Sequence, residues 1–200
     1  MQALLDHARS FHRNPGWDAE TLRALASGQS PEAMVISCSD SRVIPALITG
    51  AGPGEIFELR NAGNIVPPPD SGAPSGEAAT IEYALDVLGV RDVVVCGHSH
   101  CGAMDALASG SDLSELPGVA GWLSLVRPAL APYLGPGTGK DARLERIVQR
   151  NVVHQLAVLG SYPAARRLMN AGTLRLHGWY YRIETGALLE LGADGTFEAR

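Results

Sequence analysis

Two short segments of the sequence place metal-binding and charged side chains directly after runs of apolar residues. These side chains are Cys38, Asp40 and Arg42 in the first segment and His98 and Cys101 in the second. Alternate side chains of an extended chain point to the same side, so Cys38, Asp40 and Arg42 are expected to project together. Two thiolates and one imidazole form a donor set that suits Zn²⁺. The pattern therefore predicts one zinc ion held by Cys38, His98 and Cys101.

Three protein ligands leave one of the four tetrahedral positions of zinc open for water. Zinc lowers the pKa of that water from ~15.7 to about 7, which predicts a zinc-bound hydroxide at neutral pH. A free Asp40 carboxylate could instead bind the metal and close the site, whereas the planar guanidinium of Arg42 can hold this carboxylate away. We expect the restrained Asp40 to accept a hydrogen bond from the hydroxide and to orient it toward an electrophile.

The elements before these segments must be strands, because ligands in open parallel sheets bind beyond the carboxyl ends of the strands. Apolar runs predict strands over Met34–Cys38, Ile56–Leu59 and Val93–Cys96, and a terminal strand pair over Leu174–Ile183 and Ala187–Leu191. Apolar periodicity predicts helices over 3–13, 18–27, 78–88, 103–108, 119–130 and 143–159, and a short one near Pro163. Segments 67–76 and 131–140 are rich in Pro and Gly and are expected to be loops. The alternation predicts an α/β fold, with a mainly parallel β-sheet, helices on both faces and a terminal antiparallel strand.

The composition restricts the class of protein. A hydrophobic fraction of 46% over 200 residues supports one packed domain. Sixteen basic and 21 acidic side chains give a net charge of −5 without a basic cluster, so no nucleic acid or membrane partner is expected. No run approaches the ~20 apolar residues of a membrane span, and the N-terminus lacks a signal-like core, so a cytoplasmic protein is expected. Three cysteines form no even disulfide framework, which favours metal binding.

Further motifs accompany the two segments. They are Pro53-Gly54-Glu55-Ile56-Phe57, Arg60-Asn61-Ala62-Gly63-Asn64-Ile65-Val66, Glu82-Tyr83-Ala84 and Leu176-His177-Gly178-Trp179-Tyr180-Tyr181. Together with Cys38-Ser39-Asp40-Ser41-Arg42 and Gly97-His98-Ser99-His100-Cys101-Gly102, they resemble the β-class carbonic anhydrases over nearly the whole chain. The resemblance implies zinc-dependent, reversible hydration of CO₂ to bicarbonate. It also implies a single domain over 1–200, with an N-terminal helical arm (1–28) that lies across a partner subunit and a zinc-binding core (29–200). A homodimer or larger homo-oligomer is expected, with the pocket at the subunit interface.

The resemblance also implies a set of pocket residues and a subtype with an open zinc site. The plant-like, open subtype has a Gln nine residues before its first Cys ligand, and Gln29 stands nine residues before Cys38. Substrate-binding positions of this subtype fall on Phe57, Ala62 and Tyr83, and its backbone-donor position falls on Gly102. The other subtype, which can close its zinc with Asp, has a Trp where this chain has Val35.

Three alternative functions remain open. Gly97-His98-Ser99-His100-Cys101 nearly matches the Gly-x-Ser-x-Gly turn of hydrolases, with Ser99 as nucleophile, although Cys101 replaces the last Gly. A permanently closed Cys₂-His-Asp shell would instead make a non-catalytic bicarbonate- or zinc-binding module. The same mechanism could also act on a CO₂ analogue such as COS or CS₂.

Four other residues are expected to have structural roles rather than roles in catalysis or metal binding. Cys96 ends an apolar strand and is expected in the core. His100 could pass protons to buffer, but a solvated loop position is the simpler expectation. His154 and His177 are expected to pack or form hydrogen bonds rather than bind metal.

Overall fold

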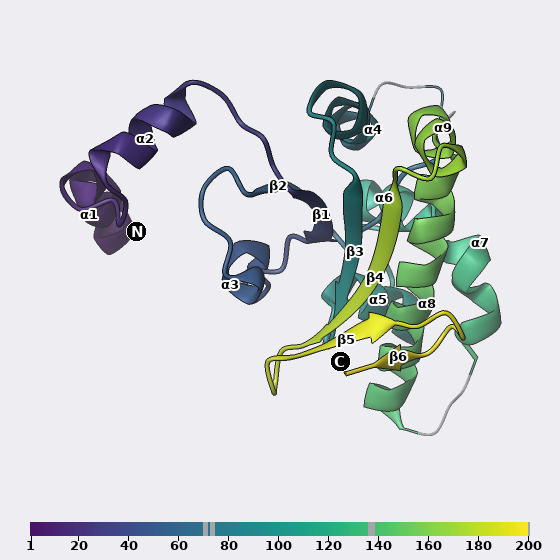
Figure 1. Cartoon of the computed structure of the whole chain (residues 1–200). Helices are drawn as coiled ribbons and strands as arrows, with labels where there is room; N and C mark the ends of the chain where they lie inside the picture. Colours follow the sequence, from purple (N-terminus) through teal and green to yellow (C-terminus); the bar gives the residue numbers. More distant parts are fainter. Residues whose placement is uncertain (70–71, 73–74, 136–138, 200) are drawn as a thin grey trace. The chain divides into compact units, whose positions relative to one another are not determined.

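The computed structural model describes residues 1–69, 72, 75–135 and 139–199, and the chain divides into two compact units, Met1–Ser30 and Pro31–Arg200 (Figure 1). The first unit consists of α1 (Gln2–Ser10), the 3-10 turn η1 (Phe11–Arg13) and α2 (Ala19–Ala26). The Asp18 side chain caps α2 by accepting the backbone N–H of Thr21 at 2.7 Å. Both helices lie where the sequence predicts them, and neither contains a buried residue.

The second unit is built on a six-stranded sheet with the order β2-β1-β3-β4-β5-β6. The strands are β1 (Ala33–Cys38), β2 (Ile56–Asn61), β3 (Asp92–His98), β4 (Arg175–Arg182), β5 (Ala187–Leu191) and β6 (Phe197–Glu198). The strands β2, β1, β3 and β4 run parallel, whereas β5 and β6 pair antiparallel at the far edge. The predicted α/β class, with a mainly parallel sheet and terminal antiparallel strands, is confirmed.

The helices of this unit connect the strands. They are α3 (Pro45–Thr49), α4 (Gly76–Glu82), α5 (Gly102–Ser109), α6 (Pro117–Ser124), α7 (Arg127–Leu130), α8 (Lys140–Ser161) and α9 (Pro163–Asn170). The end of α4 continues as a π-helical turn, η2 (Tyr83–Val87), and α7 continues as a 3-10 turn, η3 (Ala131–Tyr133). No helix in the described part of the chain is long and apolar enough to cross a membrane.

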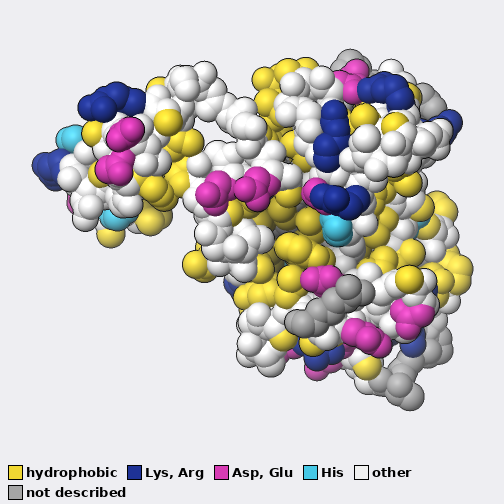
Figure 2. Space-filling model, in the orientation of Figure 1, with side chains coloured by type: hydrophobic (Ala, Val, Ile, Leu, Met, Phe, Trp, Pro, Cys, Tyr) yellow, Lys and Arg dark blue, Asp and Glu magenta, His cyan; other side chains and the backbone are white. Residues whose placement is uncertain are grey.

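The two faces of the sheet are covered differently. One face, which includes Met34, Ile36 and Val95, packs against buried residues of α4, α8 and α9. The other face carries a smaller cluster of strand residues, namely Val35, Val94 and Cys96 with partly buried Ile56, Trp179 and Tyr181. Figure 2 shows hydrophobic side chains gathered over the front of the sheet, and Figure 1 shows α5 to α9 together on one side of it. The predicted sheet flanked by helices is confirmed, and the buried contacts of α4, α8 and α9 lie on the first of these faces.

The element boundaries differ from the predicted ones in several places. The sequence does not predict α3 or β6, because segments of five and two residues carry no clear periodicity. The predicted helix over 119–130 is divided into α6 and α7. The predicted loops over 67–76 and 131–140 include residues 70–71, 73–74 and 136–138, which lie outside the described residues.

Gly97 allows α8 to lie directly against the end of β3. A Cβ atom at this position would lie 2.6 Å from Val148 Cγ1 and 2.8 Å from Val152 Cγ2, both on α8. We therefore expect Gly97→Ala to lower the free energy of unfolding by about 1–3 kcal/mol, because the helix must move to admit the methyl group. Urea unfolding at matched protein concentration measures this change.

Gly121→Ala is the matched control, because a Cβ atom at Gly121, inside α6, meets nothing within 4 Å. Alanine also has the higher helix propensity, so this variant is expected to be as stable as the wild type or slightly more stable. Equal stability of Gly97→Ala and the wild type would contradict the close approach of α8.

Candidate metal centre

Three potential ligands converge where two neighbouring parallel strands end. Cys38 is the last residue of β1, His98 is the last residue of β3, and Cys101 immediately precedes α5. All three side chains are buried, and their ligand atoms lie within 4.8 Å of one another. Ligands placed around one tetrahedral zinc ion would be roughly 3.5–3.8 Å apart, which satisfies this limit. The predicted convergence of the three residues is therefore present.

The ring of His98 is oriented for metal binding. Its Nδ1 lies 2.8 Å from the backbone carbonyl oxygen of Ser99. A carbonyl oxygen only accepts, so Nδ1 carries the proton and Nε2 has a free lone pair. Nε2 is buried and has no hydrogen-bond partner in the protein. An unpaired buried nitrogen close to two sulfur atoms fits a metal ligand, and the donor set of one nitrogen and two sulfurs suits zinc.

The two sulfur atoms are not equivalent. A hydrogen bond from the Cys101 thiol lowers the pKa of Cys38, and the N–H of Gly63 lowers it further. The Gly63 nitrogen lies 3.4 Å from Cys38 Sγ. The same bond to Cys38, together with burial, raises the pKa of Cys101. Cys38 is therefore the first of the pair to form a thiolate, and backbone N–H groups are available to stabilise its charge.

Asp40 is held by Arg42 rather than by an extended strand. The strand ends at Cys38, and the N–H of Val43 donates to the Asp40 carbonyl at 3.0 Å to close a turn. The expectation that residues 38–42 are extended is therefore wrong. The Arg42 guanidinium instead forms two bonds to the Asp40 carboxylate, Nε to Oδ1 at 2.9 Å and Nη2 to Oδ2 at 2.7 Å. The backbone N–H of Arg42 adds a third bond at 3.0 Å.

These bonds have an electrostatic and a positional effect. Arg42 holds the pKa of the Asp40 carboxyl well below its usual range. The carboxylate is therefore ionised at neutral pH while both of its oxygens are restrained. Arg42 Nη2 also donates to the His100 carbonyl at 3.2 Å, so one guanidinium connects the loop after β1 with the loop after β3.

Arg60 on β2 supports the first loop, although sequence reasoning assigns it no role. Its Nη2 donates to the carbonyl oxygens of Cys38 at 3.0 Å, Asp40 at 2.9 Å and Val43 at 2.6 Å. The β1–β2 pairing places Arg60 opposite Ser37, directly beside this loop. Arg60 begins one of the motifs quoted above and lies near the end of a strand, but neither signal indicates which carbonyl groups its guanidinium contacts.

Two buried amides on α8 hold the loop that faces Cys38. Asn151 donates to the Gly63 carbonyl at 2.9 Å, and Gln155 donates to the Asn151 side chain at 2.8 Å. The Gln155 carbonyl oxygen accepts the N–H of Val66 at 2.9 Å. Both amides are fully buried, so each depends on these bonds to offset its desolvation. Two polar residues spaced four apart on an apolar helix face are the signal that could have revealed them.

The predicted pocket residues lie on several elements, with Phe57 near the start of β2, opposite Met34, and Tyr83 directly after α4. The rings of Phe57 and Tyr83 are 6.2 Å apart, and Tyr83 is the first residue of the π-helical turn. Ala62 lies in the turn after β2, where its carbonyl accepts the indole N–H of Trp122 at 2.9 Å. Gly102 begins α5 next to Cys101. Gln29 belongs to the first compact unit, and its place in the pocket stays a prediction.

Three other residues singled out from the sequence, Ser99, Cys96 and His177, are held by hydrogen bonds or by packing. The Ser99 hydroxyl donates to Glu184 at 2.6 Å and accepts the N–H of Ile183 at 2.9 Å, so no histidine base activates it. Cys96 is buried, as predicted, and burial raises its pKa to about 12. His177 bonds the Asp92 carboxylate at 2.8 Å.

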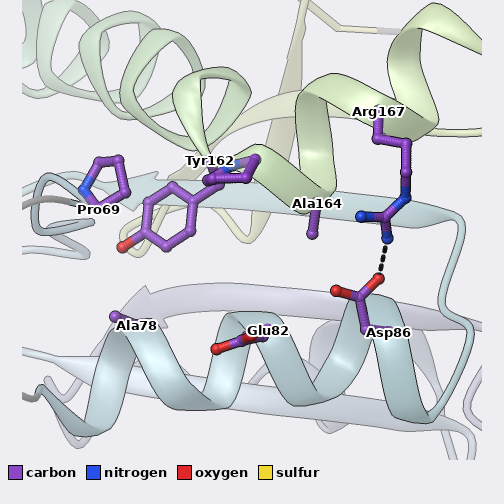
Figure 3. Close-up of a pocket in the computed structure, with 8 residues that line it drawn as sticks. Pro69, Ala78, Glu82, Asp86, Tyr162, Ala164 and Arg167 are labelled. Atoms are coloured by element: carbon purple, nitrogen blue, oxygen red, sulfur yellow. Dashed lines mark hydrogen bonds and ion pairs between the residues drawn. The ribbon is translucent and has the colours of Figure 1, made fainter.

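A cleft of about 320 Å³ between α4 and α9 is lined by none of the three metal-binding side chains (Figure 3). Tyr162 and Ala164 line it on the α9 side, and Glu82 lines it on the α4 side. Arg167 reaches across one end to form an ion pair with Asp86. Cavity size alone therefore does not locate the reactive chemistry, which the buried nitrogen and sulfur donors identify instead.

A parallel sheet with a Cys-His-Cys cluster at its carboxyl edge defines an α/β protein that could hold a metal. Comparison with known proteins identifies the family to which such a fold and site belong. Residues 33–188 match a family model described as carbonic anhydrase. The chain is 48% identical to a carbonic anhydrase of Pseudomonas aeruginosa, over 98% of this chain and 90% of that one. It is 41% identical to carbonic anhydrase 1 of Escherichia coli O157:H7, over 94% of this chain and 86% of that one.

Solved structures show the same relationship. The β-carbonic anhydrase CcaA matches with a TM-score of 0.93 at 39% identity, covering 100% of this chain and 99% of that one. A structure from Sordaria macrospora, described as one of two tetrameric β-carbonic anhydrases, matches with a TM-score of 0.78 at 34% identity, covering 96% and 94%. The chain therefore belongs to the β-class carbonic anhydrases, which are lyases.

Proposed function

We propose that this carbonic anhydrase hydrates CO₂ reversibly at a zinc ion held by Cys38, His98 and Cys101. The observation that carries the proposal is the buried, unpaired Nε2 of His98 beside two sulfur atoms. Zinc in such a site supplies the activation of water as a nucleophile near neutral pH. The protein must then hold the ion, orient the nucleophile and admit a small apolar substrate.

Asp40 is the residue proposed to orient the nucleophile. Its carboxylate is ionised and accepts three hydrogen bonds from Arg42, so it is held in one position. Oδ2 takes only one of these bonds, which leaves it free to accept a hydrogen bond from the nucleophile and so to orient it. The same bonds restrain the carboxylate from closing on the metal, which supports the open, plant-like subtype.

The substrate niche is proposed to lie near Phe57, Ala62 and Tyr83, with Gln29 as a polar donor and the Gly102 N–H as a backbone donor. Phe57 and Tyr83 supply the apolar surface that a linear, uncharged molecule such as CO₂ requires. Product bicarbonate is an anion and leaves when water replaces it. The residues proposed for this niche would accept COS or CS₂ as well as CO₂. Activity assays with each substrate therefore have to identify the one that the enzyme uses.

A second copy of the chain is proposed to complete this pocket. Tyr83 is 45% exposed and Val87, one turn further along the same helix, is 64% exposed. Leu47 on α3 is 76% exposed. Large apolar side chains at these levels of exposure suit a subunit interface. The tetrameric assembly of the Sordaria macrospora proteins supports a homodimer or larger homo-oligomer.

Metal removal tests the proposed function directly. Purified protein is expected to contain about one zinc per chain and to hydrate CO₂ in a stopped-flow assay, because three protein ligands leave one position open. Dialysis against dipicolinate should abolish turnover, and added Zn²⁺ should restore it. Zinc without CO₂ hydration would indicate a non-catalytic module, and CO₂ hydration that survives complete removal of the metal would contradict the proposed zinc site. COS is assayed in parallel.

Substitution of Arg42 separates its charge from its geometry. Arg42→Lys keeps the positive charge but loses the planar pair of donors, and Arg42→Gln loses both. Because orientation of Asp40 needs the planar pair, we expect both variants to lower kcat/KM for CO₂ by about 10²-fold. Stopped-flow assays at saturating zinc measure the effect. Near wild-type activity of Arg42→Lys would show that charge alone suffices and would contradict the orienting role.

Disruption of the proposed interface tests the subunit contact. Light scattering of the wild type is expected to give a dimer or a larger assembly. Val87→Glu places a charge on this surface and is expected to shift the protein toward monomers and to lower activity with them. Val119→Glu, at a residue of α6 that is 38% exposed, is the control and should leave the assembly intact. A monomeric wild type with full activity would rule out a pocket shared between subunits.

A further inference from the structure

The loop that carries two of the three ligands is held from both sides. On one side Arg42 donates to the His100 carbonyl at 3.2 Å. On the other side Ser99 contacts the end of β4 and the turn that follows it. The N–H of Ser99 donates to the Tyr181 carbonyl at 2.9 Å, which continues the β3–β4 pairing by one residue beyond His98.

The Ser99 side chain adds two further bonds in the same direction. Its Oγ accepts the N–H of Ile183 at 2.9 Å and donates to Glu184 Oε2 at 2.6 Å. Ser99 is 5% exposed, so its hydroxyl depends on these two partners for hydrogen bonding. With one bond accepted and one donated, the hydroxyl has a single orientation.

The backbone of Ser99 transmits this orientation to the metal ligand. Its carbonyl oxygen accepts the Nδ1–H of His98 at 2.8 Å. This bond selects the tautomer of His98 and fixes the rotation of its ring. A continuous series of bonds therefore leads from the Glu184 carboxylate, through Ser99, to the nitrogen that faces the two sulfurs.

Glu184 is suited to terminate this series. Its side chain is 49% exposed, and the bond from Ser99 lowers its pKa, so it is a carboxylate at neutral pH. A carboxylate acceptor makes a stronger bond to a hydroxyl than water or an amide does. Its Oε2 also lies 3.6 Å from Nε2 of His100, in the same loop. A small cleft of about 40 Å³ adjoins Ser99, His100 and Glu184.

We propose that Glu184 is a positioning residue for the metal centre, which acts through Ser99 to hold the His98 ring in its ligating orientation. This inference rests on the proposed zinc site and assigns Glu184 a role outside the ligand set. Groups that bond a ligating histidine on its far side tune metal affinity by about 10–100-fold. Removal of Glu184 should therefore weaken metal retention while the fold persists, because the side chain is half-exposed.

Zinc transfer from the purified holoenzyme to 4-(2-pyridylazo)resorcinol tests this proposal without reference to activity. Glu184→Ala is expected to release zinc about tenfold faster than the wild type or more. Glu184→Gln keeps an oxygen that can accept the Ser99 hydroxyl, so its rate is expected within about threefold of the wild type. Equal rates for Glu184→Ala and the wild type would overturn the proposal, as would equally fast release from both variants.

Two controls separate positioning from a general loss of stability. Asp194→Ala also removes a carboxylate that accepts a hydroxyl in a turn, here from Thr196 at 2.7 Å, and should release zinc at the wild-type rate. The zinc-free forms of Glu184→Ala and the wild type should melt at the same temperature. A lower melting temperature that accounts for the faster release would overturn the positioning role.

A double-mutant cycle tests the route through Ser99. If Glu184 acts through the Ser99 hydroxyl, Glu184→Ala should add little to the zinc release rate of Ser99→Ala. A full additional effect would show an independent route and would overturn the proposal. A wild-type protein that binds no zinc would overturn both the proposed function and this inference. If the wild type is loaded with zinc and Glu184→Ala releases it at the same rate, only this inference is overturned.

Discussion

The pairing of β1 with β3 is the constraint on which the metal centre depends. The two strands run parallel and in register, with Ser37 opposite Cys96, so their carboxyl ends reach the same edge of the sheet. Cys38 and His98 are the last residues of these strands and meet there although 60 positions separate them in the sequence. Cys101 joins them because α5 begins immediately after it. A shift of one residue in this register would move Cys38 and His98 apart along the edge of the sheet by about 3.3 Å.

The converged ligands are costly for the protein without a metal. A buried nitrogen without a partner costs about 1–3 kcal/mol, and the hydrogen bond to Cys38, together with burial, raises the pKa of Cys101 so that its thiol resists ionisation. The surrounding structure therefore has to hold the ligands in an arrangement that they would not adopt alone. Arg60, Arg42 and Asn151 provide this support through bonds to backbone carbonyls of the loops that surround the site.

The three ligands were predictable from the sequence, whereas most of the hydrogen bonds that hold their loops in place were not. Cys38, His98 and Cys101 are identified by residue type and by their place after apolar strands, which is local information. The bond from Asn151 to Gly63 spans 88 positions, and the bond from Ser99 to Glu184 spans 85. Such contacts depend on how α8 and the β4–β5 turn pack, which no local pattern specifies. The extended path expected for residues 38–42 failed for a related reason, since Arg42 and Arg60 stabilise a turn there.

The distribution of support around the ligands follows from the sheet topology. Cys38 ends the strand next to the β2 edge, so it is supported by Arg60 from β2 and by the loop held by α8. His98 ends the adjacent strand, whose other neighbour is β4, so its loop is supported by Arg42 on the β1 side and by the end of β4 on the other side. Glu184 lies at that end. Because β4 continues into an antiparallel hairpin rather than into a helix, the turn after it stays beside the metal loop and can bring a carboxylate to Ser99.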